Sequence, residues 1–435
     1  MTKRATIRTY RHGLGDCHLV TLHGKNSSKY RILIDCGVIL GTPNAKALMT
    51  GVMNSIIKET KGKVDLLVAT HEHWDHVSGF GQAAEAFSKL KVGEVWMAWT
   101  ENPKDKDARE LLASKQASIA LLEDAAMHLQ SLNPVGESPL FVSLADFYGF
   151  AANVTTRSAL EAVRDKAKPG SPRYCDPADT PTELSKFGAR IYVLGPPRDV
   201  DLLKRLNPRK NSNESYEHAL AAFEADMKPL IGKVGCDYNA PFSELDRVSI
   251  ADARQIPFFA SRYFQGPDWR RVDSDWMLAA DSLALALDNM TNNTSLVLAI
   301  ELEDQDVLLF AADAQMGNWL SWPTCSWKVK GKSVTGEDLM RRTIVYKVGH
   351  HGSHNATLKE RGLDLMDSLQ TAVIPVNQDM AKQKRWGAMP LDALVAALKR
   401  KTLEKGHVLR TDKDLPPGAK AAGVVSTSEY LEVTV

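Results

Sequence analysis

The pattern of hydrophobic and polar positions predicts alternating strands and helices in the first hundred residues. Short runs rich in β-branched and apolar residues predict strands, and apolar positions at helical spacing predict helices at about 44–60 and 76–90. The strand-like runs are ATIRTY (5–10), HLVTL (18–22), RILID (31–35), VDLLVAT (64–70) and KVGEVWMAW (91–99). Strands that alternate with helices in this way imply sheets covered by helices.

The pattern changes in the middle of the chain and then returns. Between about 100 and 290 one short strand (189–197) interrupts predicted helices at about 106–132, 157–166, 200–207, 214–229 and 275–290. Strand-like runs resume at 295–302, 306–312, 343–349, 371–376, 407–412 and in the C-terminal EYLEVTV. We therefore expect an α/β fold in a single domain, 1–435, with a helical insertion over 100–290.

A dense polar cluster directly follows the buried strand at 64–70. In ATHEHWDHVSGF (69–80), His71 and His73 are two residues apart in extended chain, which puts both rings on one side. Asp75 and His76 follow on the turn into the next helix and can point at a neighbouring position. Imidazoles and carboxylates are ligands for divalent zinc, manganese or iron. The cluster suits two adjacent ions; the alternative is a polar helix start with surface histidines.

Two later segments could complete such a site. Asp313 ends the strand in DVLLFAADAQMG (306–317), where a carboxylate can bridge two cations or cap a helix at about 315–320. The strand at 343–349 leads into a loop with three histidines, His350, His351 and His354. Because layered α/β folds gather such loops on one edge, three strand ends bearing His or Asp predict one site. Lys347, just before this loop, could contact a phosphate or face solvent.

The order of these residues, HxHxDH, then Asp313, then HHGS, resembles the metallo-β-lactamase superfamily. More closely, the chain looks like the hydrolase domain of the DNA-uptake channel protein ComEC and its soluble relatives. The supporting segments are HGLGDCHLVTL, RILIDCG, VLGPP, NNTSLVL, KVGHHGS and LRTD. The resemblance covers about 1–100 and 290–435 and leaves the middle block unmatched. It implies an αββα sandwich with two divalent metal ions at one edge, zinc first, with manganese or iron as alternatives.

The resemblance also implies roles for individual residues. It makes Asp313 the bridging carboxylate and Asp35 a support from outside the site. Asp75 would also orient the attacking water, and His350, His354 or Ser353 would stabilise developing charge or protonate the leaving group. The implied metal ligands are His71, His73, Asp75, His76, Asp313 and His351, with His350 in reserve for the last.

One histidine of the wider superfamily pattern has no obvious counterpart. It is expected between the first motif and Asp313, where this chain offers His128 and His218, both in predicted helices. Gly195 stands where some relatives carry histidine. The coordination of the first ion is therefore left open.

Composition narrows the class of protein. Hydrophobic residues are 44% and charged residues 25%, as in globular proteins. A net charge of +1 implies no overall field for polyanions. The five cysteines are scattered and never paired as CxxC, which argues against a disulfide framework and a cysteine zinc site. The N-terminus lacks the apolar segment of a signal peptide and no apolar run reaches membrane-spanning length, so a cytoplasmic protein without membrane attachment is expected.

The leading functional prediction is a hydrolase that uses a metal-activated hydroxide, with phosphodiester bonds as its target. This prediction, a nuclease or phosphodiesterase, rests on the ComEC-like resemblance. Basic and aromatic residues lie close together in RYFQGPDWRR (262–271) and KRW (384–386), a pairing suited to nucleic acid or to packing in a core. Alternatives are hydrolysis of another ester, a lactone or a thioester, or a catalytically silent scaffold. The insertion could bind a protein partner or a second copy of the chain.

Overall fold

The computed structural model describes residues 3–132, 155–167, 172–204, 248–265, 286–353, 355, 357–384, 389–402 and 406–435. The chain divides into two compact units. The first comprises Met1–Leu112, Ala145–Pro208 and Asn289–Val435, and the second comprises Ala113–Leu144 and Arg209–Asp288. The predicted helix at 214–229, His218, His354 and most of the predicted helix at 275–290 lie outside the described residues.

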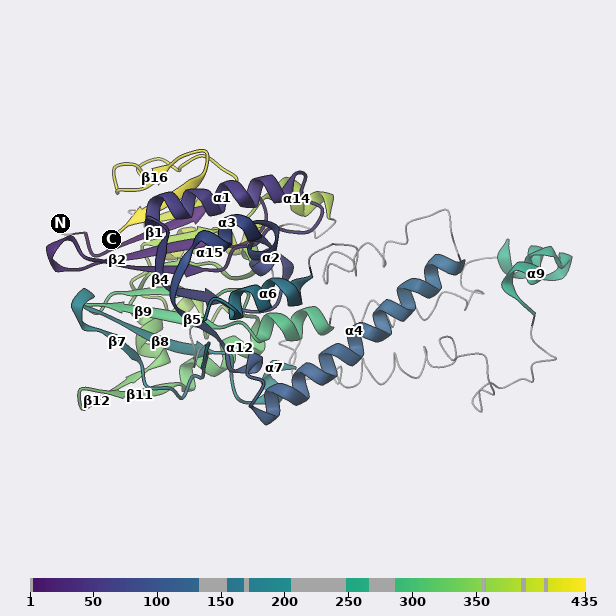
Figure 1. Ribbon diagram of the computed structural model, residues 1–435, viewed down its shortest axis with the longest axis horizontal. Helices are drawn as coiled ribbons and strands as arrows, with labels where there is room; N and C mark the ends of the chain where they lie inside the picture. The colour runs from purple at the N-terminus through teal and green to yellow at the C-terminus, as the bar shows by residue number, and fades with distance from the viewer. Residues whose placement is uncertain are drawn as a thin grey trace. The chain divides into compact units, whose positions relative to one another are not determined.

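The first unit contains an eight-stranded sheet. Its strand order is β16-β17-β1-β2-β3-β4-β5-β6. Strands β3 to β6 are parallel to one another, and the others pair antiparallel. The strands are β1 (Ala5–Tyr10), β2 (His18–His23), β3 (Lys29–Ile34), β4 (Lys63–Ala69), β5 (Lys91–Ala98), β6 (Arg173–Cys175), β16 (Val425–Ser426) and β17 (Tyr430–Thr434). Because β1 pairs with β17, the two ends of the chain lie side by side (Figure 1).

A second sheet of seven strands has the order β15-β14-β13-β10-β9-β8-β7. Strands β10, β13, β14 and β15 run parallel, while β7, β8 and β9 pair antiparallel. The strands are β7 (Thr182–Leu184), β8 (Ala189–Gly195), β9 (Val297–Leu302), β10 (Val307–Phe310), β13 (Thr343–Lys347), β14 (Thr371–Ile374) and β15 (His407–Arg410). A separate hairpin joins β11 (Ser326–Val329) to β12 (Lys332–Thr335).

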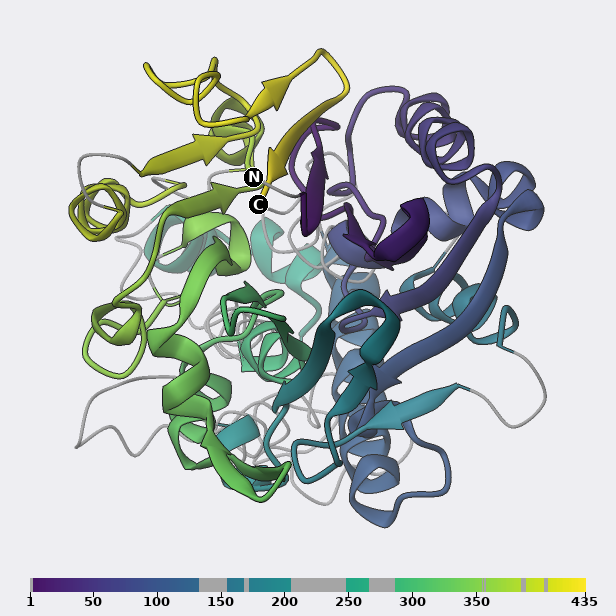
Figure 2. The same cartoon turned by 90° about the vertical axis from the view of Figure 1, so that its left-hand side faces the viewer.

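Three hydrophobic clusters define four layers in this unit. One cluster fills the space between the two sheets, and it takes Leu298, Ile300 and Leu302 from one face of β9. The opposite face of β9, with Val297 and Ala299, packs under helices on the outside of the second sheet. A third cluster lies under helices on the outside of the first sheet. Figure 2 shows the purple-to-blue elements of the first sheet and its helices opposite the green elements of the second.

The covering helices belong to one sheet or the other. The first sheet is covered by α1 (Ala45–Thr60), α2 (Trp74–Gln82), α3 (Ala84–Lys89) and α6 (Thr156–Arg164). The second is covered by α12 (Met316–Ser321), α13 (Gly336–Arg341), α14 (Gln378–Gln383) and α15 (Asp392–Lys401). A short helix, α7 (Val200–Leu203), follows β8. The predicted α/β class is confirmed.

The structure corrects several details of the predicted elements. The single helix predicted at 76–90 is two helices that meet at Ala83. Strands β6 and β7 fall inside the block predicted as a helical insertion, yet each pairs within one of the two sheets. Both have only three residues, too short for a recognisable alternation of polar and apolar positions.

The middle of the chain also contains α4 (Lys106–Leu132), as predicted, and α9 (Ile250–Gln255), α10 (Pro257–Phe259) and a π-helical turn (Ala260–Phe264). Among the described residues, no helix is long and apolar enough to cross a membrane. The four described cysteines are free thiols.

Candidate metal centre

The first histidine motif is held in place by Asp35. Strand β4 ends at Ala69, and Thr70 then donates two hydrogen bonds to the Asp35 carboxylate, from its backbone N–H (2.8 Å) and its hydroxyl (2.6 Å). Asp35 also accepts from Nδ1 of His76 (2.8 Å). Asp35 itself has a left-handed backbone (φ 56) and is buried. This buried carboxylate therefore fixes both ends of the loop that carries the motif.

The same loop is pressed against a neighbouring turn. A Cβ added to Gly37 would lie 2.4 Å from the carbonyl carbon of Asp75 and 2.4 Å from the backbone nitrogen of His76. Glycine is therefore required there by close approach of two backbones. The backbone N–H of Cys36 donates to the carbonyl of His76 (2.8 Å), which joins the two segments. The position of Asp75 and His76 thus depends on the segment that follows β3.

Asp313 follows β10, and its two carboxylate oxygens have different partners. Oδ1 accepts from the backbone N–H of His350 (3.0 Å) and from Nζ of Lys347 (3.4 Å). Oδ2 lies 3.0 Å from Nε2 of His76. The hydroxyl of Ser295 accepts from the Asp313 N–H (3.2 Å). One oxygen of Asp313 is therefore held by the protein, while the other points at the histidine motif.

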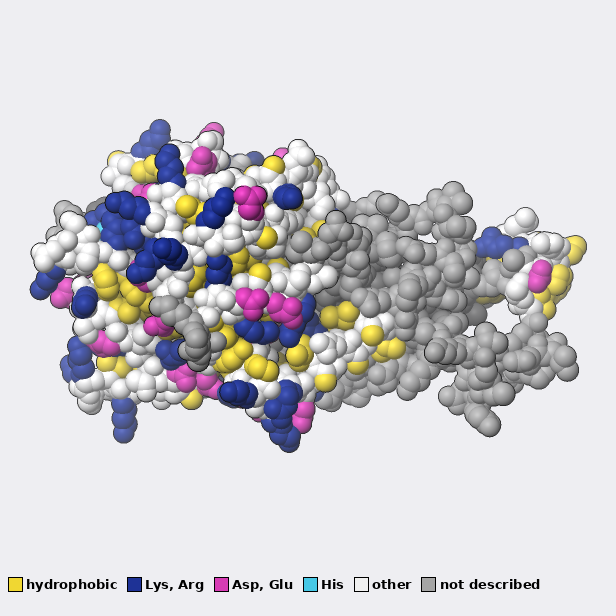
Figure 3. Space-filling view, in the orientation of Figure 1, with side chains coloured by type: hydrophobic (Ala, Val, Ile, Leu, Met, Phe, Trp, Pro, Cys, Tyr) yellow, Lys and Arg dark blue, Asp and Glu magenta, His cyan; other side chains and the backbone are white. Residues whose placement is uncertain are grey.

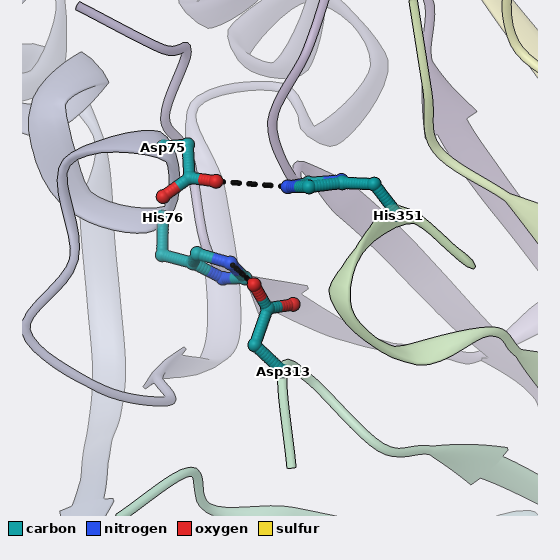
Figure 4. Close-up of side chains that lie close together, drawn as sticks. All are labelled: Asp75, His76, Asp313 and His351. Carbon is teal, nitrogen blue, oxygen red and sulfur yellow. Dashed lines mark hydrogen bonds and ion pairs between the residues drawn. The ribbon is translucent and has the colours of Figure 1, made fainter. Parts of the chain in front are cut away.

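His351 lies in a 3-10 turn, Gly349–Gly352, after β13. His350 (φ 43) and His351 (φ 53) both have left-handed backbones, which few residues other than glycine adopt. Nδ1 of His351 donates to the carbonyl of Pro375 (2.7 Å), and Nε2 lies 2.8 Å from Oδ2 of Asp75 (Figure 4). The strained turn thus presents one imidazole nitrogen to the first motif.

Four side chains form the core of the site. Asp75, His76, Asp313 and His351 each offer one ligand atom, and these atoms all lie within 4.8 Å of one another. All four residues are buried, and Figure 4 shows them converging on a common centre. Nδ1 of His76 donates to Asp35, and Nδ1 of His351 donates to the Pro375 carbonyl. Nε2 of each ring therefore points to the centre of the site. Metal-binding histidines are oriented in this way, so the donor set fits a divalent cation.

His71 and His73 lie beside this cluster. Nε2 of His71 is 3.1 Å from Nδ1 of His73, and the rings of His71 and His76 are 4.2 Å apart between centroids. Nδ1 of His71 lies near the hydroxyls of Thr70 (3.1 Å) and Ser295 (3.3 Å). The structure therefore brings all six predicted ligands into one neighbourhood, with four in the tight cluster and two next to it.

The buried charges shift one another's ionisation. Burial disfavours a charged imidazole at His76, but Asp313 and the other surrounding carboxylates outweigh it and raise the pKa of His76 well above its usual value. Burial opposes charge on Asp313 as well, yet His76 and Lys347 lower the pKa of its carboxyl well below the usual range. At His71, burial and the neighbouring His76 lower the pKa. In the metal-free site, the protonated His76 ring supplies the positive charge that a bound cation would otherwise supply.

His350 lies at the edge of the cluster and heads a chain of hydrogen bonds. Its Nδ1 is 2.8 Å from the hydroxyl of Ser353, which donates to Oδ1 of Asn355 (2.9 Å). Nδ2 of Asn355 in turn donates to Oδ1 of Asn289 (3.2 Å). Because the Ser353 hydrogen goes to Asn355, the serine oxygen accepts from His350. This contact favours the tautomer of neutral His350 that carries its hydrogen on Nδ1 and has a lone pair on Nε2.

Two histidines were candidates for a further metal ligand, and the described residues include neither side chain. The side chain of His128 and the whole of His218 lie outside them. At Gly195, an added Cβ would lie 1.9 Å from Oδ1 of Asn318. Asn318 is itself fixed by hydrogen bonds to the carbonyls of Asn293 and Ser295 (both 2.9 Å). A histidine at position 195 would overlap this amide, so Asn318 fills the space that such a side chain would need.

Two residues of the site were not predicted as parts of it. Asp16 is buried and joins a second group of potential ligands with Asp35 and His76. Lys347 was expected to contact a phosphate or to face solvent; instead it is buried against Asp16 and Asp313. The GLGD turn that ends in Asp16 was visible in the sequence, but it gave no sign of a long-range partner.

Comparison with known families supports this assignment. Residues 11–122 match the family model of the Metallo-beta-lactamase superfamily. The matched segment includes Asp16, Asp35 and the His71–His76 motif. No curated protein and no solved structure gave a match. The two sheets with helices on both outer faces are consistent with the metallo-β-lactamase sandwich, as predicted. The family match and the cluster of histidines and aspartates together indicate a metal-dependent hydrolase.

Proposed function

We propose that this protein is a hydrolase that uses two divalent metal ions, zinc first, with manganese or iron as alternatives, and that it cleaves phosphodiester bonds. The observation that carries the metal-dependent part is the cluster of Asp75, His76, Asp313 and His351. Each imidazole donates from Nδ1 to a supporting acceptor and turns Nε2 towards a carboxylate of the cluster. Nitrogen and carboxylate donors of this kind suit all three metals. His71 and His73 would hold the second ion together with Asp313.

Each part of the cluster has a chemical role in this proposal. A divalent ion held by Asp75, His76, Asp313 and His351 would supply a nucleophile at neutral pH and polarise the bond under attack. Asp75 accepts hydrogen bonds there and orients the attacking water. Asp35 and the Pro375 carbonyl hold His76 and His351 in one ring orientation. The burial of all four ligands keeps bulk water away from the reacting atoms.

His350 is the proposed proton carrier at the edge of the site. Ser353 and Asn355 keep its hydrogen on Nδ1, so Nε2 can take a proton from water and pass it to the leaving group. Nε2 of Gln315 lies 3.4 Å from the same Nδ1, and because an amide nitrogen can only donate, a hydrogen on Nδ1 requires this amide to be reversed. With its oxygen turned towards the ring, it would accept from that nitrogen as well. His354, outside the described residues, stays a predicted second proton carrier.

The choice of phosphodiester substrates is supported by the ComEC-like sequence motifs. The described part of the face in Figure 3 carries lysine and arginine side chains interspersed with acidic ones. This mixture agrees with the net charge of +1 and gives that face no single sign. We therefore propose that side chains close to the metal ligands, rather than the charge of this face, select the substrate. Hydrolysis of another ester, a lactone or a thioester is the alternative, and partner binding or self-association through 100–290 stays a prediction.

The decisive experiment measures bound metal and turnover together. Protein purified without chelators is analysed by mass spectrometry for zinc, manganese and iron. It is then incubated with single- and double-stranded DNA, RNA, bis-p-nitrophenyl phosphate, a lactone and a thioester. We expect bound metal and cleavage of at least one phosphodiester. Turnover of the lactone or thioester alone would remove the phosphodiester assignment, and absence of metal would remove the hydrolase itself.

A further inference from the structure

Lys347 is a buried lysine directly beneath the cluster of metal ligands. Its side chain is 2% exposed. The ammonium group donates to the carbonyl of Ala312 (2.8 Å), contacts Oδ1 of Asp313 (3.4 Å) and forms an ion pair with Asp16. An ammonium group has three N–H donors, and here it has three acceptors. Its hydrogen bonding is therefore complete, and none of it is left for a substrate.

The charges around Lys347 explain why a cation lies there. Four buried carboxylates are linked through shared contacts in this region: Asp16, Asp35, Asp75 and Asp313. Among the described residues, Lys347 is the one lysine or arginine that forms an ion pair with any of them; the other partners are histidines. Histidines bound to metal are neutral. The lysine therefore supplies the fixed protein cation of the metal-loaded site.

The contact with Asp313 has a geometric consequence. Lys347 and the backbone N–H of His350 both hold Oδ1, which leaves Oδ2 to face His76. Without these donors, the carboxylate could rotate and present either oxygen, or both. Asp16 keeps Lys347 in position, because its own carboxylate is 1% exposed and pairs with the ammonium.

We propose that Lys347, held by Asp16, is a positioning residue for metal binding: it locks the Asp313 carboxylate so that Oδ2 alone faces the metal ions. This inference rests on the proposed metal centre, and it concerns affinity and ligand geometry rather than the chemical step. Residues that orient metal ligands typically change metal affinity about 10- to 100-fold when replaced.

Two variants separate orientation from simple charge. Lys347→Met removes the ammonium and makes the site more negative, so attraction between charges alone would tighten cation binding. Loss of orientation would weaken it. The double variant Asp16→Asn with Lys347→Met removes one charge of each sign, so the net charge of the site is unchanged. We expect weaker binding in Lys347→Met and about 10- to 100-fold weaker binding in the double variant.

The chain provides a control pair that shares two contact distances with Lys347 but is partly exposed. Nζ of Lys401 donates to the carbonyl of Asp364 (2.8 Å) and contacts Asp367 (3.4 Å), which are the same two distances as at Lys347. This pair lies on α15 and the loop before β14, away from the metal ligands. The double variant Asp367→Asn with Lys401→Met should bind metal as the unmodified protein does.

The measurement is the dissociation constant for Zn²⁺, obtained on metal-stripped full-length protein by competition with a chromophoric chelator. Circular dichroism checks that each variant is folded. Tighter binding by Lys347→Met, or unchanged binding by the charge-matched double variant, would overturn the proposal. So would failure of both variants to fold while the control folds, because the pair would then serve core stability. If the unmodified protein binds no Zn²⁺, the proposed function fails instead.

Discussion

His351 and Asp75 are 276 residues apart in the sequence, yet Nε2 of the histidine lies 2.8 Å from Oδ2 of the aspartate. Asp75 lies in the first turn of α2, on the first sheet, and His351 follows β13, in the second. The site is thus built by the meeting of two sheets, and each sheet supplies ligands that the other cannot replace.

Replacing His351 by alanine should remove metal and activity together. The variant loses one of four clustered ligands and leaves Asp75 without its imidazole partner. We expect at least about 100-fold weaker metal binding, more than for a residue that only supports a ligand. Metal content after dialysis and cleavage of bis-p-nitrophenyl phosphate report the two effects. His407→Ala, on β15, is the control. Full metal content in His351→Ala would show that the ligand is misassigned.

Ser353→Ala should slow turnover with little effect on substrate binding. The serine oxygen accepts the Nδ1 hydrogen of His350, and its loss lets that hydrogen move to Nε2. General acid–base catalysis contributes about 100-fold or more, so partial loss of the correct tautomer should lower kcat by about 10-fold at constant KM. Ser88→Ala, an exposed serine on α3, should change neither. If Ser353→Ala has the same kcat as the unmodified protein, either His350 is not the proton carrier or Ser353 does not orient it.

Metal-stripped protein should lose stability as the pH rises above neutrality. The carboxylates around His76 raise its folded pKa well above the usual value of 6.5, despite the opposing effect of burial. A raised folded pKa adds stability that is complete below the unfolded pKa and disappears as the pH climbs through the folded one.

Asp313 has the opposite effect on the pH dependence of stability. Burial opposes charge on Asp313, but His76 and Lys347 lower its folded pKa well below 3.8, so its contribution is present above that value and is lost on acidification. The lowered folded pKa of His71 acts in the same direction, because its contribution is lost as the pH falls below about 6.5. Thermal unfolding with EDTA, measured from pH 4 to 9, should therefore show greatest stability near neutrality and a loss on either side. Zn²⁺ binding should strengthen with pH, because it displaces protons. A melting temperature that rises steadily through pH 8 in EDTA would contradict this assignment.

Gly37→Ala should damage the site from a distance. The added methyl would lie 2.4 Å from the backbone of Asp75 and His76, so the ligand loop must shift. We expect a loss of about 1–3 kcal/mol in the free energy of unfolding, as for overpacked positions, together with weaker metal binding. Gly51→Ala is the matched control. An added Cβ there meets nothing within 4 Å in the middle of α1, and alanine should stabilise the helix by about 0.5–1 kcal/mol. Chemical denaturation measures the free energy of unfolding of both variants. Equal values for Gly37→Ala and Gly51→Ala would show that the ligand loop tolerates the shift.

Much of this site could be predicted because its ligands follow buried strands. Runs such as VDLLVAT and TIVYKVG identify strands without any knowledge of their partners, and His71–His76 and His351 come directly after them. The position of Asp313 at the end of β10 then follows from the same rule. Local sequence therefore determines which residues stand at strand ends.

Pairings across the chain could not be predicted in this way. Asp16 and Lys347 are 331 positions apart (347 minus 16), and each alone is compatible with a surface residue. Their contact depends on how the two sheets are placed, which no local pattern encodes. The same is true of Asn318 and Gly195, whose close approach fills the space where some relatives carry histidine. Strands β6 and β7 were missed because three residues carry too little periodicity.

The division of the ligands between the two sheets has a consequence for biosynthesis. Asp75 and His76 leave the ribosome early, but the tight four-ligand cluster is incomplete until His351 has been added, 276 residues after Asp75. A nascent or truncated chain that ends before His351 can offer a cation only part of this cluster. An ion bound by all four ligands would link the two sheets, so full occupancy of this cluster would require that synthesis has passed β13 and that the two sheets have docked.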